Sequence, residues 1–202
     1  MIKVALPKGR IAKESLALFE KVYAKKFVFD DRKLILQQDD FIFMLVRSQD
    51  VPTYVHYQAA DIGIVGRDVI EEQQVDLVKL LDLKIGKCKV VVGSQEGKGI
   101  DYQKPQIKIA TKMPNITRKY FATKAVAIEA LKLYGSIELA PLVGLSDGIV
   151  DIVETGATMK QNHLKIDEVI MESSAFLVAN QHSFYEKKAL ILDIYQKLQE
   201  VI

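Results

Sequence analysis

The chain has little cysteine, no tryptophan and no long apolar run. Among its 202 residues Cys88 is the single cysteine, so no disulfide can form within the chain and no Cys/His spacing suggests zinc. The longest apolar runs, such as Phe41 to Val46, are far shorter than the ~18 residues that span a membrane. The first residues lack the apolar segment of a signal peptide. We therefore expect a cytoplasmic protein without a membrane segment.

The chain also lacks an excess of either charge. It has 28 Lys and Arg against 26 Asp and Glu, a net charge of +2, and no block of like charge. A nucleic-acid arm or a polybasic anchor needs such a block, so we expect neither nucleic acid nor membrane as a partner. His56, His163 and His182 show no metal-ligand spacing, and we assign no metal site to the protein. Any anion site must be local.

What the chain does contain is an alternation of strand and helix patterns. With 49% hydrophobic residues it can bury a proper core. Apolar runs at residues 2–6, 41–46, 60–66 and 107–111 alternate with segments of helical periodicity. This alternation predicts an α/β fold with parallel strands covered by helices, in which ligands bind at the carboxyl ends of the strands.

Two further strand patterns and a terminal helix complete the prediction. Residues 27–29 and 34–36 are expected to form an antiparallel pair joined by a charged turn. Residues 171–178 are expected to form one long strand. The amphipathic segment 187–202 predicts a helix that packs back on the first domain.

The glycine-rich polar loop at residues 94–99 follows a strand and indicates a crossing between two domains near residue 92. We therefore expect a discontinuous first domain, residues 1–91 and 179–202, and a second domain, residues 92–178.

The most informative stretch runs from Glu138 to Lys160. The run Ile149–Val153 predicts a buried strand, and Thr155-Gly156-Ala157-Thr158 follows where a helix can begin. Small residues let a ligand approach the main chain, and the first N–H groups of a helix are unpaired donors, so the loop can hold a phosphate. The same four residues also suit a simple helix N-cap.

Two acidic residues favour the phosphate interpretation. Asp151 lies within the apolar run, and Glu138 directly precedes Leu139-Ala140-Pro141-Leu142. A carboxylate in such surroundings is costly unless it has a partner. Ribose hydroxyl groups are suitable partners, so a strand carboxylate with a phosphate loop downstream suits a ribose 5-phosphate.

Two basic turns are further candidates for an anion site. Lys8 and Arg10 lie between the first strand and a helix, and Arg32 and Lys33 lie in the charged turn. From the residues alone, each turn can equally be a solvated surface turn.

The chain resembles the ATP phosphoribosyltransferase family. The family's signature is matched by Glu138, Gly144-Leu145-Ser146, Ile149, Asp151-Ile152 and Thr155-Gly156-Ala157-Thr158-Met159. Motifs similar to those of the family also occur, in the family order, at Leu6–Arg10, Ala59–Gly66 and Ile109–Lys112. The resemblance covers nearly the whole chain.

This resemblance implies a two-lobed fold of the periplasmic-binding-protein type II kind, with the active site in the cleft between the lobes. The implied reaction transfers the phosphoribosyl group of 5-phosphoribosyl 1-diphosphate to N1 of ATP and releases pyrophosphate, as the first step of histidine biosynthesis. Mg²⁺ would be carried with the substrate diphosphate. No nucleophilic side chain is needed, because the adenine N1 attacks C1 of the ribose.

The resemblance also implies roles for individual residues. The 5-phosphate would be held by Thr155, Gly156, Ala157 and Thr158, and Glu154 is a further candidate for substrate binding. Glu138 and Asp151 would bind the ribose hydroxyl groups.

The expected catalytic residues are the cations Arg10, Arg32 and Lys33, which would act on the diphosphate, with Lys33 a candidate to act across a dimer interface. Lys8, Arg47 and Asp68 are expected on the ATP side.

The chain is similar to the short form of the family, because it ends after one amphipathic helix at Ile202. Such members work with a regulatory subunit that resembles a histidyl-tRNA synthetase and confers inhibition by histidine. We expect a homodimer alone and a hetero-octamer with that subunit. The alternative is a non-catalytic effector- or solute-binding module of the same fold, which would bind its ligand without turnover.

Overall fold

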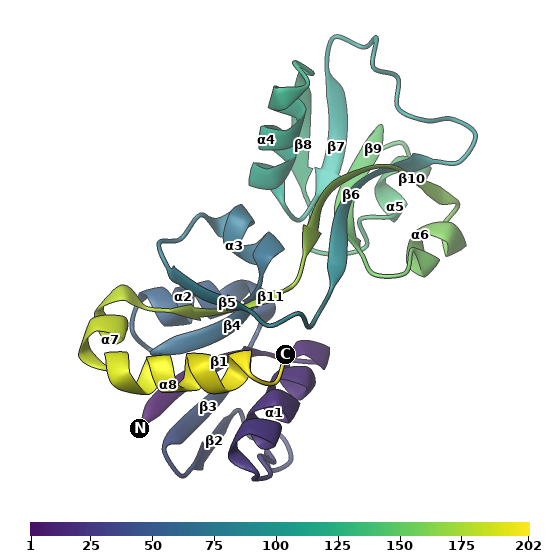
Figure 1. The fold of residues 1–202 in the computed structure, drawn as a ribbon. Coiled ribbons are helices and arrows are strands. Elements are labelled where there is room, and N and C mark those ends of the chain that lie inside the picture. Colours follow the sequence, from purple (N-terminus) through teal and green to yellow (C-terminus); the bar gives the residue numbers. More distant parts are fainter. The chain divides into compact units, whose positions relative to one another are not determined.

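The computed structural model describes residues 1–202 and divides into two compact units, each built on its own β-sheet (Figure 1). Unit 1 comprises Met1–Lys87 and Ser174–Ile202, and unit 2 comprises Cys88–Ser173. The α/β class and the discontinuous first unit agree with the sequence. The chain passes between units after Lys87 and after Ser173, whereas the sequence placed these boundaries after residues 91 and 178.

Two strands account for the difference in boundaries. Strand β6 (Cys88–Gln95) belongs wholly to the second sheet. The single strand expected at residues 171–178 is two strands, β10 (Leu164–Ser173) in unit 2 and β11 (Ala175–Ala179) in unit 1. Only Ser174 separates them, so the apolar pattern is continuous although its two halves lie in different sheets.

Unit 1 contains a six-stranded sheet in the order β2-β3-β1-β4-β11-β5. Its strands, besides β11, are β1 (Ile2–Pro7), β2 (Ile35–Gln38), β3 (Phe41–Val46), β4 (Ile62–Gly66) and β5 (Val78–Asp82). The central strand β1 pairs in parallel with β3 and β4, whereas β2 and β11 are antiparallel to their neighbours. Parallel strands at the centre are those that the alternating pattern predicts.

Helices flank this sheet. They are α1 (Arg10–Tyr23), α2 (Val51–His56), α3 (Arg67–Gln73), α7 (Gln181–Glu186) and α8 (Lys188–Gln199), with a short 3₁₀ turn, η1 (Ser48–Asp50). Helix α8 buries Ile191, Ile194 and Leu198 in the core of unit 1, which confirms the predicted packing of the C-terminal segment.

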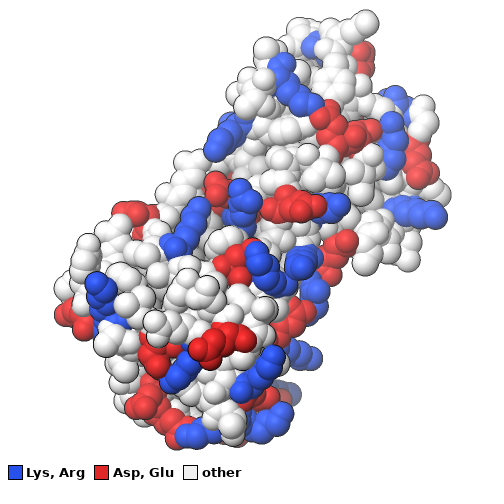
Figure 2. Space-filling view, viewed as in Figure 1, with Lys and Arg blue, Asp and Glu red and all other residues white.

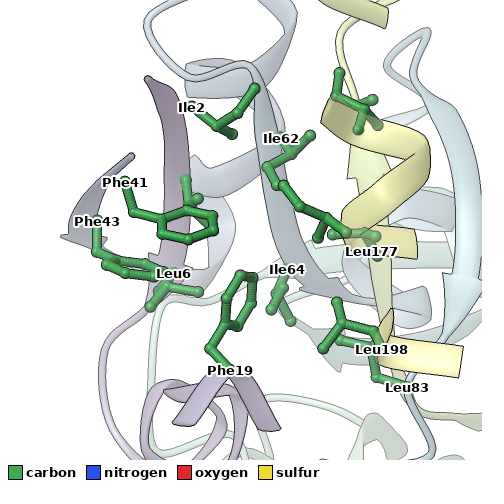
Figure 3. Packing of buried hydrophobic residues seen from close by; sticks show 14 of the residues in the cluster. Ile2, Leu6, Phe19, Phe41, Phe43, Ile62, Ile64, Leu83, Leu177 and Leu198 are labelled. Atoms are coloured by element: carbon green, nitrogen blue, oxygen red, sulfur yellow. The ribbon is translucent and has the colours of Figure 1, made fainter. Parts of the chain in front are cut away.

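The aromatic core shows why one predicted hairpin is wrong. Phe27 is buried beside Phe41 and Phe43, with ring centroids 5.0 Å from those of Phe43, so residues 27–29 fill the core and form no strand. Strand β2 instead pairs with β3 through the tight turn at Asp39, which has a left-handed φ of 52°. Figure 3 shows Phe19 from α1 packed against the same two phenylalanines.

Unit 2 contains a five-stranded sheet in the order β10-β6-β9-β7-β8. Its remaining strands are β7 (Ile107–Thr111), β8 (Ile128–Lys132) and β9 (Gly148–Val153), and its helices are α4 (Pro114–Thr123), α5 (Leu139–Leu142) and α6 (Ala157–Gln161). Strand β7 pairs in parallel with β8 and β9, while β6 and β10 are antiparallel. Strand β9 is therefore central, with its main chain paired on both sides.

None of the helices has both the length and the apolar character that crossing a membrane requires. Lys and Arg side chains are interspersed with Asp and Glu on the face shown in Figure 2, as the near balance of charge suggests.

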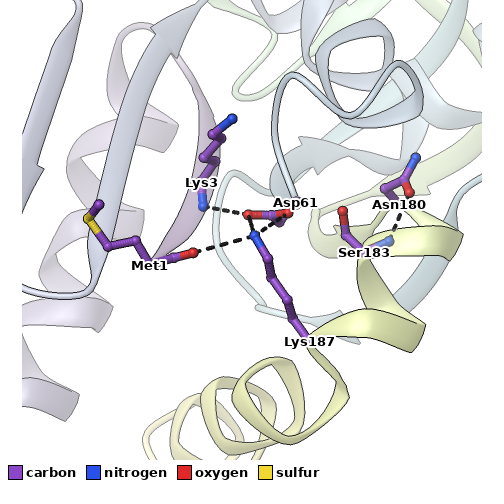
Figure 4. A network of polar contacts seen from close by, with 6 residues as sticks. All are labelled: Met1, Lys3, Asp61, Asn180, Ser183 and Lys187. Carbon is purple, nitrogen blue, oxygen red and sulfur yellow. Dashed lines mark hydrogen bonds and ion pairs between the residues drawn. The ribbon is translucent and has the colours of Figure 1, made fainter.

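A partly buried ion pair connects the C-terminal segment to the N-terminal part of unit 1 (Figure 4). The Lys187 ammonium donates to both carboxylate oxygens of Asp61, at 2.9 and 2.8 Å, and the Lys3 N–H donates to Oδ2 at 2.9 Å. Burial raises the pKa of Asp61, but hydrogen bonds from Lys187, Lys3 and Ser183 outweigh burial, and the pKa lies below its ordinary value. The ionised carboxylate is thus the form that the fold stabilises.

This pair yields a prediction about stability. Replacing Lys187→Met leaves the Asp61 carboxylate buried without its cation, so the free energy of unfolding should fall by about 1–3 kcal/mol at neutral pH. A lowered pKa contributes stability above the unfolded-state pKa and loses it as the pH falls through the folded-state pKa. The difference from wild type should therefore shrink in acid, as measured by urea unfolding at neutral and acidic pH.

Lys188→Met is the matched control, because Lys188 is the adjacent lysine and its side chain is exposed. It should unfold like wild type at both pH values. A loss in Lys187→Met that is equally large in acid would show that the lysine acts through packing and not through the charge of Asp61.

Candidate active site

A cavity of about 270 Å³ lies at the carboxyl end of β9 in unit 2. We call it the loop cavity; its walls are Glu138, Asp151, Ile152, Val153, Glu154, Thr155, Gly156, Ala157, Thr158 and Met159. The six residues that the sequence assigned to phosphate and ribose therefore lie together, and Glu154, the further candidate for substrate binding, lies with them. The carboxyl end of a parallel strand is where ligands bind in sheets of this kind.

The loop between β9 and α6 is shaped by Gly156. This residue caps α6 with a left-handed φ of 81°, a conformation that favours glycine. The Thr155 hydroxyl accepts a hydrogen bond from the Ala157 N–H at 3.4 Å, so it interacts with the start of the helix as a cap does. Thr155, Ala157 and Thr158 are exposed. The loop thus has features of both interpretations of its sequence. It is a capped helix start, and it is also an open wall of a pocket that is rich in hydrogen-bond donors.

Asp151 is the buried charge of the loop cavity. It lies in the middle of β9 and is only 7% exposed. Its Oδ1 accepts a hydrogen bond from the Ile152 N–H at 2.9 Å and lies 3.7 Å from the Lys112 ammonium. Burial raises the pKa of Asp151, Ile152 and Lys112 oppose the increase, and Glu138 adds to it, so the pKa lies above its ordinary value.

Glu138 reaches the loop cavity from a different segment. It is half-buried at the start of the short helix α5, whose residues Ala140 and Pro141 are buried. Helix α5 packs against β9 and thereby places the Glu138 carboxylate near that of Asp151. Two carboxylates from separate elements thus border one cavity, an arrangement that suits a pair of hydroxyl groups.

Lys112 is a residue of this region to which sequence analysis assigned no role. It directly follows β7, whose Thr111 pairs with Val150 of β9, and this pairing places Lys112 beside Asp151. Its motif resembles that of the family, but an exposed lysine after a strand carries no signal of its own. Only the register of β7 against β9 shows which carboxylate it meets.

The remaining predicted residues belong to unit 1 and do not line the loop cavity. Lys8, Arg47 and Asp68 follow strands β1, β3 and β4, which run in parallel. Their strands end at the same edge of the sheet; Pro7 pairs with Val46, and the Lys8 N–H donates to the Val46 carbonyl at 2.8 Å. Asp68 is buried in the first turn of α3.

The charged turn lies at this edge too. Strand β2 runs antiparallel to β3, and the Leu45 N–H donates to the Leu34 carbonyl, so Arg32 and Lys33 lie beyond the carboxyl end of β3. Arg32 has a left-handed φ of 61°, and the Lys33 ammonium is paired with Asp30. Arg10 begins α1 and forms an ion pair with Glu14 at 3.5 Å. We call Lys8, Arg10, Arg32, Lys33 and Arg47 the basic edge of unit 1.

Comparisons with known proteins identify the family of the chain. The model of the family described as HisG: ATP phosphoribosyltransferase matches residues 47–200. The chain is 79% identical to the ATP phosphoribosyltransferase of Helicobacter hepaticus over 202 residues, 100% of this chain and 98% of the relative. It is 70% identical to that of Wolinella succinogenes over 204 residues, 100% of this chain and 99% of the relative.

Solved structures show the same relationship. The ATP phosphoribosyl transferase (HisG:HisZ) complex from Thermotoga maritima contains a chain with a TM-score of 0.88 and 36% identity, covering 100% of this chain and 98% of that one. The periplasmic aliphatic sulphonate binding protein SsuA from Escherichia coli has a TM-score of 0.63 at 14% identity, covering 98% of this chain and 71% of that one. The second likeness shows the fold alone, which is the two-lobed architecture that the sequence predicted.

Family model, full-length relatives and solved structure thus point to one conclusion, which the two carboxylates and the glycine loop of the loop cavity had suggested. The chain belongs to the ATP phosphoribosyltransferase family, whose reaction is the first step of histidine biosynthesis.

Proposed function

We propose that this chain transfers the phosphoribosyl group of 5-phosphoribosyl 1-diphosphate to N1 of ATP, and that the loop cavity binds the phosphoribosyl group. The observation that carries the proposal is the loop cavity itself, where two carboxylates and a glycine-capped helix start border about 270 Å³ of space. A ribose 5-phosphate needs acceptors for its hydroxyl groups and donors for its phosphate. Both kinds of group line this cavity.

Within the loop cavity we assign the 5-phosphate to Thr155, Gly156, Ala157 and Thr158. Their exposed hydroxyl and main-chain N–H groups are donors that suit a phosphate. Asp151 and Glu138 are assigned to the ribose hydroxyl groups, because ionised carboxylates are acceptors. Glu154 borders the same space and is assigned to substrate binding.

The basic edge is assigned to the diphosphate and to ATP. When pyrophosphate leaves C1, negative charge grows on the leaving group and positive charge grows on the ribose. Arg10, Arg32 and Lys33 would stabilise the leaving group, so the protein contributes positioning and charge and supplies no nucleophile. Lys8, Arg47 and Asp68 are assigned to the ATP side, since they follow neighbouring parallel strands.

Mg²⁺ is proposed to arrive with the diphosphate as part of the substrate. No three His, Cys, Asp or Glu side chains of the chain are grouped so that they could hold a metal ion. Mg²⁺ commonly keeps several waters and binds through substrate phosphates together with few protein ligands, which suits such a chain.

A regulatory partner is also proposed. The Thermotoga maritima chain of high similarity was solved as a HisG:HisZ complex, and this chain has nearly its full length. We propose that this chain is a short-form member, a homodimer alone, that joins a histidyl-tRNA-synthetase-like subunit in a hetero-octamer. The non-catalytic alternative is favoured only by likeness to ligand-binding proteins such as SsuA, which extends to the fold and not to a site.

The first functional prediction concerns Asp151. In Asp151→Asn the charged acceptor is lost, so binding of 5-phosphoribosyl 1-diphosphate should weaken by about 1.5–3 kcal/mol while the fold persists. Calorimetric titration measures the affinity, and circular dichroism checks the fold. Asp101→Asn, on an exposed turn of the same unit, is the control and should bind like wild type. Unchanged binding in a folded Asp151→Asn protein would remove Asp151 from the site.

The second concerns Arg32. An interaction that is stronger in the transition state lowers the barrier, so Arg32→Ala should reduce kcat by a larger factor than it raises the KM for ATP. Steady-state kinetics with both substrates separates the two effects. Arg118→Ala, an exposed arginine on α4, serves as the control for loss of one positive charge. If only the KM for ATP changes, Arg32 belongs to the ATP side.

The third concerns regulation. Allostery requires a second site, and we assign that site to the partner subunit. The purified chain should therefore be a dimer that is weakly inhibited by histidine, and mixing it with its partner should give a larger complex that histidine inhibits. Light scattering and activity assays test both statements. Strong inhibition of the chain alone would contradict the assignment to the short form and leave the catalytic proposal intact.

A further inference from the structure

The ribose-binding role proposed for Asp151 requires a charged carboxylate. An ionised carboxylate accepts hydrogen bonds at both oxygens, whereas a protonated one loses its charge and part of its acceptor capacity. The inference below rests on that proposed role. It asks how this buried carboxylate remains ionised before substrate arrives.

Most of the surroundings of Asp151 oppose ionisation. The residue as a whole is 7% exposed, and the residue paired with it on β6 is the fully buried Val91. From α5, the Glu138 carboxylate adds negative charge, and Glu154 borders the same cavity. Two carboxylates near one another, one of them buried, favour uptake of a proton.

Lys112 is the cation that faces Asp151. Its ammonium lies 3.7 Å from Oδ1, presented from the end of β7 by the parallel pairing of Thr111 with Val150. The carboxylate side chain is 10% exposed and that of the lysine 40%, so one partner is buried and the other remains in contact with water. The lysine can therefore favour the charged carboxylate without itself being fully desolvated.

We propose that Lys112 is a positioning residue of the phosphoribosyl diphosphate site, whose ammonium group keeps Asp151 ionised and ready to accept the ribose hydroxyl groups. It acts on the substrate through Asp151. Its contribution therefore depends on pH, because it matters most where Asp151 would otherwise take up a proton. A lysine that merely attracts the phosphates by its charge would contribute at every pH.

The test compares Lys112→Met with wild type by calorimetric titration of 5-phosphoribosyl 1-diphosphate between about pH 5.5 and pH 8.5. Removing the cation stabilises protonated Asp151, so binding in the variant should be lost at a higher pH than in wild type. The ratio of the variant's Kd to that of wild type should thus rise by about threefold or more from the alkaline to the acidic end. Taking the ratio cancels protonation of the ligand's own phosphates.

Lys108→Met is a closely matched control. Lys108 lies on β7, the strand that Lys112 directly follows, and its ammonium is also 3.7 Å from a carboxylate, that of Glu129, outside the loop cavity. Lys108→Met removes the same charge by the same substitution. The ratio of its Kd to that of wild type should stay constant with pH. Lys112→Arg keeps the cation and should restore the wild-type profile.

A second variant separates this inference from the proposed role of Asp151. In Asp151→Asn the group that titrates is gone, so adding Lys112→Met should produce no further pH-dependent loss. A Kd ratio for Lys112→Met that is constant with pH, or equal to that of Lys108→Met, would overturn the inference while Asp151 keeps its role. Wild-type binding in Asp151→Asn would instead overturn the proposed role.

Discussion

Parallel pairing at the centre of each sheet determines where the candidate residues of each unit lie. In unit 1, β1 runs in parallel between β3 and β4, so the residues that follow these strands emerge at one edge. In unit 2, β7 and β9 are parallel, and the same rule places Lys112 beside Asp151. Main-chain hydrogen bonds between the strands thus bring together residues that are far apart in the sequence. This placement does not depend on contacts between their side chains.

A buried carboxylate in a central strand is a cost that the fold must offset. Asp151 interrupts a strand whose neighbours Ile149 and Val150 are fully buried, at a position where an apolar residue would pack more favourably. The Ile152 N–H and the Lys112 ammonium offset part of the cost. Asp61 in unit 1 is a contrasting case, because its oxygens receive donors from Lys187 and Lys3 and its pKa is lowered. Asp61, whose burial is more fully compensated by donors, has a structural role, whereas Asp151, whose burial is less compensated, borders the loop cavity.

The sequence allowed the α/β class, the central strands and the membership of the loop cavity to be predicted, because these follow from short-range patterns. The run from Ile149 to Val153 and the glycine of the helix start are local signals, and the structure places them as expected. The misplaced features depend on long-range pairing. Phe27 looks like a strand residue but fills the core, and Ser174 is the single residue at which the chain changes sheets. The contact between Lys112 and Asp151 could not be predicted for the same reason, because the sequence of one strand does not determine its register against another.

The order of strands in unit 1 also bears on how the chain folds as it is synthesised. Strand β5 pairs only with β11, and β11 also pairs with β4, yet all of residues 88–173 lie between β5 and β11 in the sequence. A growing chain that has just completed β5 therefore has an unfinished sheet with an open edge. Unit 2 is contiguous and can fold as soon as it has emerged, as domains generally do during translation. The sheet of unit 1 consequently stays incomplete until β11, near the C-terminus, has been synthesised. The nascent chain therefore completes the fold of unit 2 before that of unit 1.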